Sequence, residues 1–318
     1  MTAGFENAVT GSPKTCLALA NGPVCAHQTE ARAALACTLE VPFAHLPPEN
    51  KARAFGLEYA SLQLPDGGQL FVTPYGWTLR HYLLPQQWYT HKRFHRVGER
   101  QQDGVGTVYK VPVSPAGARP KFLVVKFSRF AQSSLVYMGS YLPRGLSPGA
   151  LADAYLNSPF EEFGLLVALR KTQVRAKSQV RTKRPLAIYS PPDIIDSRLL
   201  GRSESRFASC VARLERDQDS NGGAVRIRLD ICRQYILLYE WVKGENAKTL
   251  CRQGALPLDE LRQLVTSTND DLRAAGFRIL DNKPERIILR RRKRDGSLLR
   301  RQGRLVYALV DFELLKQP

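Results

Sequence analysis

The chain has 318 residues, a hydrophobic fraction of 43% and a formal net charge of +18. These values exclude a disordered tail and a membrane bundle, and no run of about 18 apolar residues predicts a transmembrane helix. The first residues lack the basic and apolar regions of a secretory signal, so we expect a cytoplasmic protein that does not associate with a membrane. The positive charge favours anionic partners in general, such as phosphates and nucleic acids, without identifying one.

The cysteines are scattered single residues without a Cys-x-x-Cys pair. Isolated thiols are typical of small buried side chains in a reducing compartment, which agrees with a cytoplasmic location. Neither Cys25 with His27 nor His91 with His95 has further ligands nearby, so the sequence predicts no metal site at these positions.

Residues 1–90 are predicted to form an N-terminal extension whose role the sequence does not reveal. Residues 44–50 are typical of a turn or linker because they contain adjacent prolines. Two apolar and aromatic runs within 57–77 flank the sequence Pro65-Asp66-Gly67-Gly68. This pattern predicts a β-hairpin in the extension.

Short strands and a helix are predicted in the next part of the chain. The stretch FLVVKF (122–127) is an apolar strand that contains Lys126, and burying a lysine is costly unless an acidic group pairs with it. The helix predicted over 158–170 offers Glu161 and Glu162 as partners. We expect the glutamate that is not the partner to be exposed on the helix surface.

Two amphipathic helices are predicted in the second half of the chain. One, over 204–220, ends before Asn221-Gly222-Gly223, and the other, over 258–276, ends at Gly276, a residue type that suits a helix C-terminus. The apolar face of the first helix consists of Phe207, Cys210, Val211 and Leu214. The apolar face of the second consists of Leu258, Leu261, Leu264, Val265 and Leu272.

Two segments near the C-terminal end combine an acidic residue with an apolar strand. ILDNKPERIIL (279–289) places Asp281 two residues before Lys283, and YALVDFELL (307–315) is an apolar strand that reaches Asp311. Between them, residues 290–304 contain eight Lys or Arg residues, and Asp295-Gly296 predicts a hairpin turn there.

Taken in chain order, five motifs resemble those of the protein-kinase-like superfamily. They are a glycine-containing turn before a strand (96–113), the Lys126 strand with its glutamate helix, the segment YILLYEWVKGENA (235–247), the Asp281 segment and the Asp311 segment. The resemblance implies an α+β fold class with a protein-kinase-like domain at 91–318. This domain would have an antiparallel-sheet N-lobe with one main helix (about 91–242), a hinge (240–244) and a short, incomplete helical C-lobe (245–318).

The resemblance implies an ATP site between the two lobes. Lys126 would hold the α- and β-phosphates of ATP and would pair with Glu162, with Glu161 as the second choice. The family has glycines where this chain has Gln101 and Asp103, and side chains at these positions hinder close approach of the backbone to phosphate.

The adenine base would be enclosed by residues from both ends of the N-lobe. By the resemblance, Gly106 ends the glycine-rich loop and Val108 covers the base. Tyr239 would be the gatekeeper residue beside the base, and Glu240 and Val242 would offer backbone groups to adenine.

The catalytic residues implied by the resemblance depart from the family pattern. Asp281 would accept the proton of the attacking hydroxyl, Lys283 would steady the transferred phosphate, and Asp311 would bind Mg²⁺. Arg286 stands where the family has a metal-binding asparagine, so we expect one Mg²⁺ site to be weakened and Arg286 to contact a phosphate directly. Glu313 replaces the family's glycine and adds a carboxylate.

The implied function is an ATP-binding protein-kinase-like protein that transfers phosphate to a protein serine or threonine hydroxyl, with Mg²⁺ as a cofactor. Because only seven residues follow Asp311, we do not expect the helices with which a kinase normally holds its protein substrate. The alternative is a catalytically inactive pseudokinase that acts as a nucleotide-binding or basic-surface module. Nucleic acid or an acidic protein would then bind the basic stretches 171–184 and 290–304, which otherwise form a solvated surface.

Overall fold

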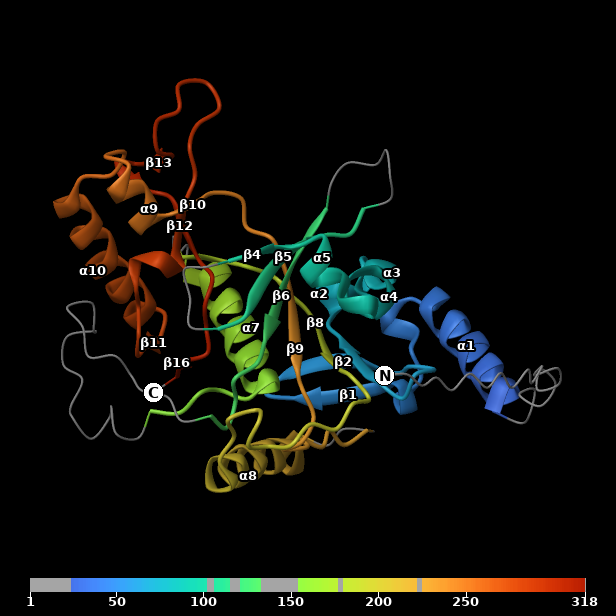
Figure 1. Cartoon of the computed structure of the whole chain (residues 1–318). Helices are drawn as coiled ribbons and strands as arrows, with labels where there is room; N and C mark the ends of the chain where they lie inside the picture. Colours follow the sequence, from blue (N-terminus) through green and yellow to red (C-terminus); the bar gives the residue numbers. More distant parts are fainter. Residues whose placement is uncertain are drawn as a thin grey trace, which may run out of the picture.

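The computed structural model describes residues 24–101, 106–114, 121–132, 154–176, 180–221 and 225–317. The fold is α+β, with one large antiparallel sheet and several helices (Figure 1). No helix in the described ranges is both long and apolar enough to cross a membrane.

The large sheet has eight strands in the order β1-β2-β3-β8-β9-β6-β5-β4, and each neighbouring pair is antiparallel. Strands β2 and β3 form the hairpin predicted around Pro65–Gly68. Because β3 also pairs with β8, the N-terminal strands continue the same sheet that contains Lys126. The strands are β1 (Lys51–Ala54), β2 (Leu57–Gln63), β3 (Gln69–Val72), β4 (Glu99–Arg100), β5 (Val108–Pro112), β6 (Phe122–Phe127), β8 (Pro185–Ser190) and β9 (Ile236–Glu240).

Alternating side chains of the sheet enter two separate hydrophobic cores, as strand geometry requires. In β9, for example, Leu237 and Tyr239 belong to one core, whereas Ile236 and Leu238 belong to the other. The first core includes residues of α7 (Pro159–Ala176) and α8 (Glu204–Asn221). The second includes residues of the N-terminal helices α1 (Val24–Glu40), α2 (Pro74–Trp77), α3 (Arg80–Leu83) and α4 (Pro85–Trp88), with Phe94 of α5 (Arg93–Arg96) packed against it.

A smaller region beside the large sheet holds the C-terminal helices and short strands (Figure 1). Its four-stranded sheet has the order β10-β12-β15-β7, in which β15 and β7 are parallel. The elements are β7 (Arg181–Thr182), β10 (Glu245–Asn246), α9 (Ala247–Arg252), α10 (Leu258–Ala274), β11 (Arg278–Ile279), the 3₁₀ turn η4 (Pro284–Arg286), β12 (Ile287–Leu289), β13 (Arg300–Arg301), β14 (Arg304–Leu305), β15 (Tyr307–Leu309) and β16 (Leu315–Lys316).

Helix α10 has the predicted apolar face with one exception. Four of the five residues assigned to that face are buried, but Leu258 is 51% exposed because it stands at the first helical position, where the helix projects into solvent. The predicted end is confirmed: Gly276 has a φ of +78°. The amides of Gly276 and Phe277 donate hydrogen bonds to the carbonyls of Arg273 and Leu272, each over 2.9 Å, which is the Schellman pattern.

Helix α8 and the basic segment also follow their predicted patterns. Cys210 and Leu214 of α8 are buried, whereas Cys37 of α1 is exposed, so burial does not hold for every thiol. The basic segment turns at the predicted place, with Arg291 bridged to Leu298. It then turns a second time between β13 and β14, which the sequence did not predict. The glycines predicted to end α8 lie outside the described residues.

Candidate functional site

Lys126 is the centre of a buried ionic cluster formed by three separate parts of the chain. Its Nζ lies 2.9 Å from Oε1 of Glu162 on α7 and 2.9 Å from Oδ1 of Asp311, just after β15. Lys126 is only 4% exposed, and burial by itself would lower its pKa. The carboxylates of Asp311, Glu162 and Glu313 outweigh burial and raise the pKa of Lys126 above its ordinary value, so the side chain is a fixed cation.

The two glutamates of α7 have different partners. Besides pairing with Lys126, Glu162 accepts a hydrogen bond from the hydroxyl of Tyr239, whose pKa is raised by burial and by this carboxylate. Glu161 forms an ion pair of 3.2 Å with Arg213 of α8 and accepts a hydrogen bond from Tyr155. The expectation that the second glutamate is exposed is therefore wrong, because Glu161 is buried and paired with a residue of α8.

Arg286 links the two aspartates of the C-terminal motifs. Its Nε lies 3.0 Å from Oδ2 of Asp311, and its second terminal nitrogen lies 3.3 Å from Oδ2 of Asp281. Burial would raise the pKa of Asp311, but Arg286 and Lys126 hold it well below its usual range. Asp311 is therefore ionised and has a cation on each carboxylate oxygen.

Asp281 lies in the loop between β11 and η4, and both of its ionic partners come from the same loop. The Nζ of Lys283 lies 3.1 Å from Oδ2 of Asp281, and Arg286 also donates a hydrogen bond to the backbone carbonyl of Asp281. The neighbouring Asn282 donates to Asn269 of α10 over 2.8 Å, which ties this loop to the helix. The loop is thus held in one conformation, with its carboxylate already engaged by two cations.

Glu313 is the third carboxylate that forms an ion pair with Lys126. Its Oε1 lies 3.3 Å from the Lys126 Nζ, and its Oε2 lies 2.6 Å from Arg129. The preceding Phe312 is fully buried. Arg129 was missed by sequence reasoning, because no motif contains it and only the tertiary structure brings it to Glu313.

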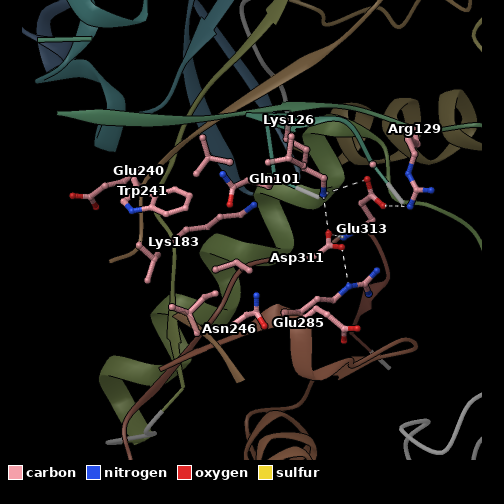
Figure 2. A pocket seen from close by; sticks show the side chains of 17 residues that line it. Gln101, Lys126, Arg129, Lys183, Glu240, Trp241, Asn246, Glu285, Asp311 and Glu313 are labelled. Atoms are coloured by element: carbon pink, nitrogen blue, oxygen red, sulfur yellow. Dashed lines mark hydrogen bonds and ion pairs between the residues drawn. The ribbon is translucent and has the colours of Figure 1, made fainter. Parts of the chain in front are cut away.

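A pocket opens beside this cluster, between the large sheet and the C-terminal region (Figure 2). One end is lined by Lys126, Arg129, Arg286, Asp311 and Glu313. The other end is lined by apolar side chains and by the segment predicted as a hinge. Glu240 and Trp241 lie on this side, and Val108, Val124, Val242 and Ile288 also line the pocket.

The pocket gathers most, but not all, of the residues singled out in the sequence. Gly106, Val108, Lys126, Glu240, Val242, Arg286 and Asp311 all line it. Of the remaining described candidates, Glu162 and Tyr239 lie buried behind Lys126, and Asp281 and Lys283 lie next to Arg286 without lining the pocket. Gln101 also lines the pocket, whereas Asp103 lies outside the described residues.

The backbone N–H of Val242 makes no hydrogen bond with any residue in the described part of the chain. It belongs to the segment that lines the apolar end of the pocket. A free backbone donor beside apolar walls is a common way to orient a flat polar ligand.

Lys183 is a pocket residue that the sequence did not reveal. It belongs to the basic stretch 171–184, which we expected to be solvated, yet Lys183 is only 3% exposed and lines the pocket. Its Nζ lies 3.4 Å from the centre of the Tyr239 ring. Burial, together with the nearby Lys126, lowers the pKa of Lys183 to about 7. A run of basic residues gave no signal that one of them turns inward.

Within the described ranges, no group of three or more His, Cys, Asp or Glu side chains is arranged to hold a metal ion by itself. No protein-family model matches this sequence, and no curated protein matches it significantly.

Proposed function

We propose that this chain binds a nucleoside triphosphate in the pocket and transfers phosphate to a protein hydroxyl, as its resemblance to protein-kinase-like proteins implies. The observation that carries the proposal is the ionic cluster of Lys126, Glu162 and Asp311 at one end of the pocket. Phosphoryl transfer depends mainly on positioning and on electrostatic stabilisation, and a lysine held by a glutamate beside a metal-binding aspartate supplies both.

The opposite end of the pocket supports a nucleotide with a flat base. Val108 and Ile288 provide apolar contact, and the N–H of Val242, which makes no hydrogen bond within the described ranges, provides a donor. ATP is the nucleotide that the resemblance implies.

The donor set fits one Mg²⁺ that is shared with the nucleotide. Mg²⁺ is usually held by one or two carboxylates together with substrate phosphates, and Asp311 offers an ionised carboxylate that lines the pocket. A bound Mg²⁺ would neutralise phosphate charge. Arg286 stands beside Asp311, where it supplies a cation to the phosphates in place of a second metal site.

The arrangement favours slow phosphate transfer. The resemblance assigns Asp281 to orient the attacking hydroxyl, but Asp281 does not line the pocket and its carboxylate is already engaged by Lys283 and Arg286. We expect rates well below the 1–100 per second, roughly, of ordinary kinases. Asp281→Asn should abolish transfer from radiolabelled ATP while leaving ATP binding intact, and transfer that persists in this variant would contradict the assigned mechanism.

Calorimetric titration with ATP and Mg²⁺ tests the binding step. Lys126→Met should weaken ATP binding by about 1.5–3 kcal/mol, because a charge-assisted contact to phosphate is lost. Lys171→Met is a matched control, since Lys171 is an exposed residue of α7 outside the pocket. Wild-type protein that binds no nucleotide at millimolar concentration would refute the proposal.

A second candidate is a pseudokinase-type module that binds polyanions through the basic segment. Arg292, Lys293 and Arg294 are exposed and form no ion pair with any described residue. If ATP binds and no transfer is detected, this candidate explains the chain better. Its partner would be nucleic acid or an acidic protein.

A further inference from the structure

Lys183 differs from the other cations of the pocket in having no acidic partner. Lys126, Arg129 and Arg286 each form at least one ion pair, whereas no carboxylate of the described residues lies within ion-pair distance of Lys183. Its close contacts are the faces of two aromatic rings, Tyr239 at 3.4 Å and Phe312 at 5.9 Å from the ring centres. Such contacts attract a cation but do not accept its hydrogen bonds.

The side chain of Lys183 enters the pocket from the side of Trp241. Figure 2 shows it extending from the side of Trp241 toward Lys126, whereas Arg129, Asp311 and Glu313 lie at the opposite end. Its ammonium group therefore lies between the Trp241 side of the pocket, where the proposed function places the base, and Lys126, and it faces Glu162, Asp311 and Glu313 from beyond ion-pair distance.

A buried ammonium group donates hydrogen bonds and accepts none. Without an acceptor it is poorly solvated, and the lowered pKa of Lys183 reflects this. A ligand that brings an oxygen to this position supplies the missing hydrogen-bond acceptor. A ligand that brings an amino group supplies no acceptor to the protonated form of Lys183.

We propose that Lys183 makes the pocket select purine nucleotides with an oxygen at position 6, as in guanine and hypoxanthine, over adenine, which has an amino group there. This inference rests on the proposed nucleotide binding and on the contact between Val242 and the polar edge of the base, which carries position 6. Lys183, Glu240, Trp241 and Val242 all line the pocket, and Lys183 enters it from the side of Trp241.

A comparison of ITP with ATP tests the inference, because the two nucleotides differ at the polar edge of the base. Calorimetric titration of wild-type protein should give a dissociation constant for ITP that is lower than that for ATP by about ten-fold or more, since a hydrogen bond to a charged group is commonly worth that much. GTP should bind as ITP does. Lys183→Met, which keeps the length of the side chain and removes its charge, should abolish the preference.

Two further variants separate the role of Lys183 from a general effect of charge. Lys183→Arg should retain a preference for ITP, and Lys171→Met, which removes an exposed lysine of α7, should leave the wild-type ratio unchanged. Equal affinities of the wild type for ITP and ATP would overturn the inference and leave nucleotide binding in place. An equal loss of affinity for both nucleotides in Lys183→Met would assign Lys183 to the phosphates and would also overturn it. Absence of binding by either nucleotide would refute the proposed function itself.

Discussion

The cations at the two ends of the pocket differ in whether carboxylates pair with them. At the proposed phosphate end, Lys126, Arg129 and Arg286 are all held by carboxylates. At the proposed base end, Lys183 is buried among aromatic rings and has no acidic partner in the described part of the chain. The first group of cations is arranged before any ligand binds, whereas Lys183 needs a ligand to complete its hydrogen bonds.

A cation near a pocket therefore does not by itself indicate an anion site. The ionic cluster is balanced internally, because Glu162, Asp311 and Glu313 surround Lys126. An incoming phosphate must therefore compete with carboxylates at that end. Lys183, in contrast, forms no ion pair with the described residues, so an acceptor oxygen of a ligand displaces no carboxylate from it.

Removing the central cation should have the largest effect. Lys126→Met leaves three buried carboxylates without their shared partner, and breaking a buried ion pair from one side costs about 3–5 kcal/mol of stability. Urea unfolding measures the change. Lys110→Met on the neighbouring strand is the control, because Lys110 pairs only with the exposed Glu99 and should cost about 1 kcal/mol or less. Equal losses in the two variants would show that the cluster is not the stabilising feature.

Removing the unpaired cation should change how stability depends on pH. Because the folded pKa of Lys183 is about 7, below its unfolded value, the unfolded chain binds more protons between these two values. The stability of the wild type should therefore rise relative to Lys183→Met as pH increases from 6 to 9, by about 1–3 kcal/mol. The charges that face Lys183 are Lys126, Glu162, Asp311 and Glu313, and all remain in the variant.

Urea unfolding of both proteins at several pH values measures this difference directly. Lys316, whose pKa is also lowered to about 7, is present in both proteins, so its contribution cancels in the comparison. A difference in stability that does not change with pH would mean that Lys183 stays protonated in the folded protein.

Removing a competing carboxylate from the proposed phosphate end should increase nucleotide affinity. Glu313→Gln frees Lys126 and Arg129 from one negative charge, so nucleotide affinity measured by calorimetry should increase by about ten-fold. Glu285→Gln is the matched control, since Glu285 also lines the pocket but pairs with Lys248 outside it. A decrease in affinity in Glu313→Gln would mean that Glu313 positions Lys126 and does not compete with phosphate.

The basic segment 290–304 also contains both paired and unpaired cations, and substitutions there should have the smallest effect of those predicted. Arg291, Arg300 and Arg304 pair with Glu245, Glu260 and Asp271, whereas Arg292, Lys293 and Arg294 have no acidic partner among the described residues. Replacing the second set by serine should reduce the salt slope of nucleic-acid binding by about 2–3, and replacing the first set should reduce it less. Fluorescence titrations at several salt concentrations compare the two triple variants, and identical slopes would mean that pairing does not matter there.

Local sequence determined the features that depend on near neighbours in the chain. Pro65-Asp66-Gly67-Gly68 produces a tight turn, Gly276 adopts a positive φ to end α10, and the spacing of apolar residues defines α8. A lysine within an apolar strand indicated that Lys126 needs an acidic partner, and the motif resemblance implied that Glu162 is that partner.

Tertiary structure alone decided which charged groups share a site. Arg129 and Glu313 are far apart in the chain, as are Glu161 and Arg213, and no local pattern relates their positions. Lys183 lies in a run of basic residues that is typical of a solvated surface, but its side chain is buried against the ring of Tyr239. Helix and turn formation follow from local backbone preferences, whereas burial and ion pairing depend on long-range packing that a linear pattern does not contain.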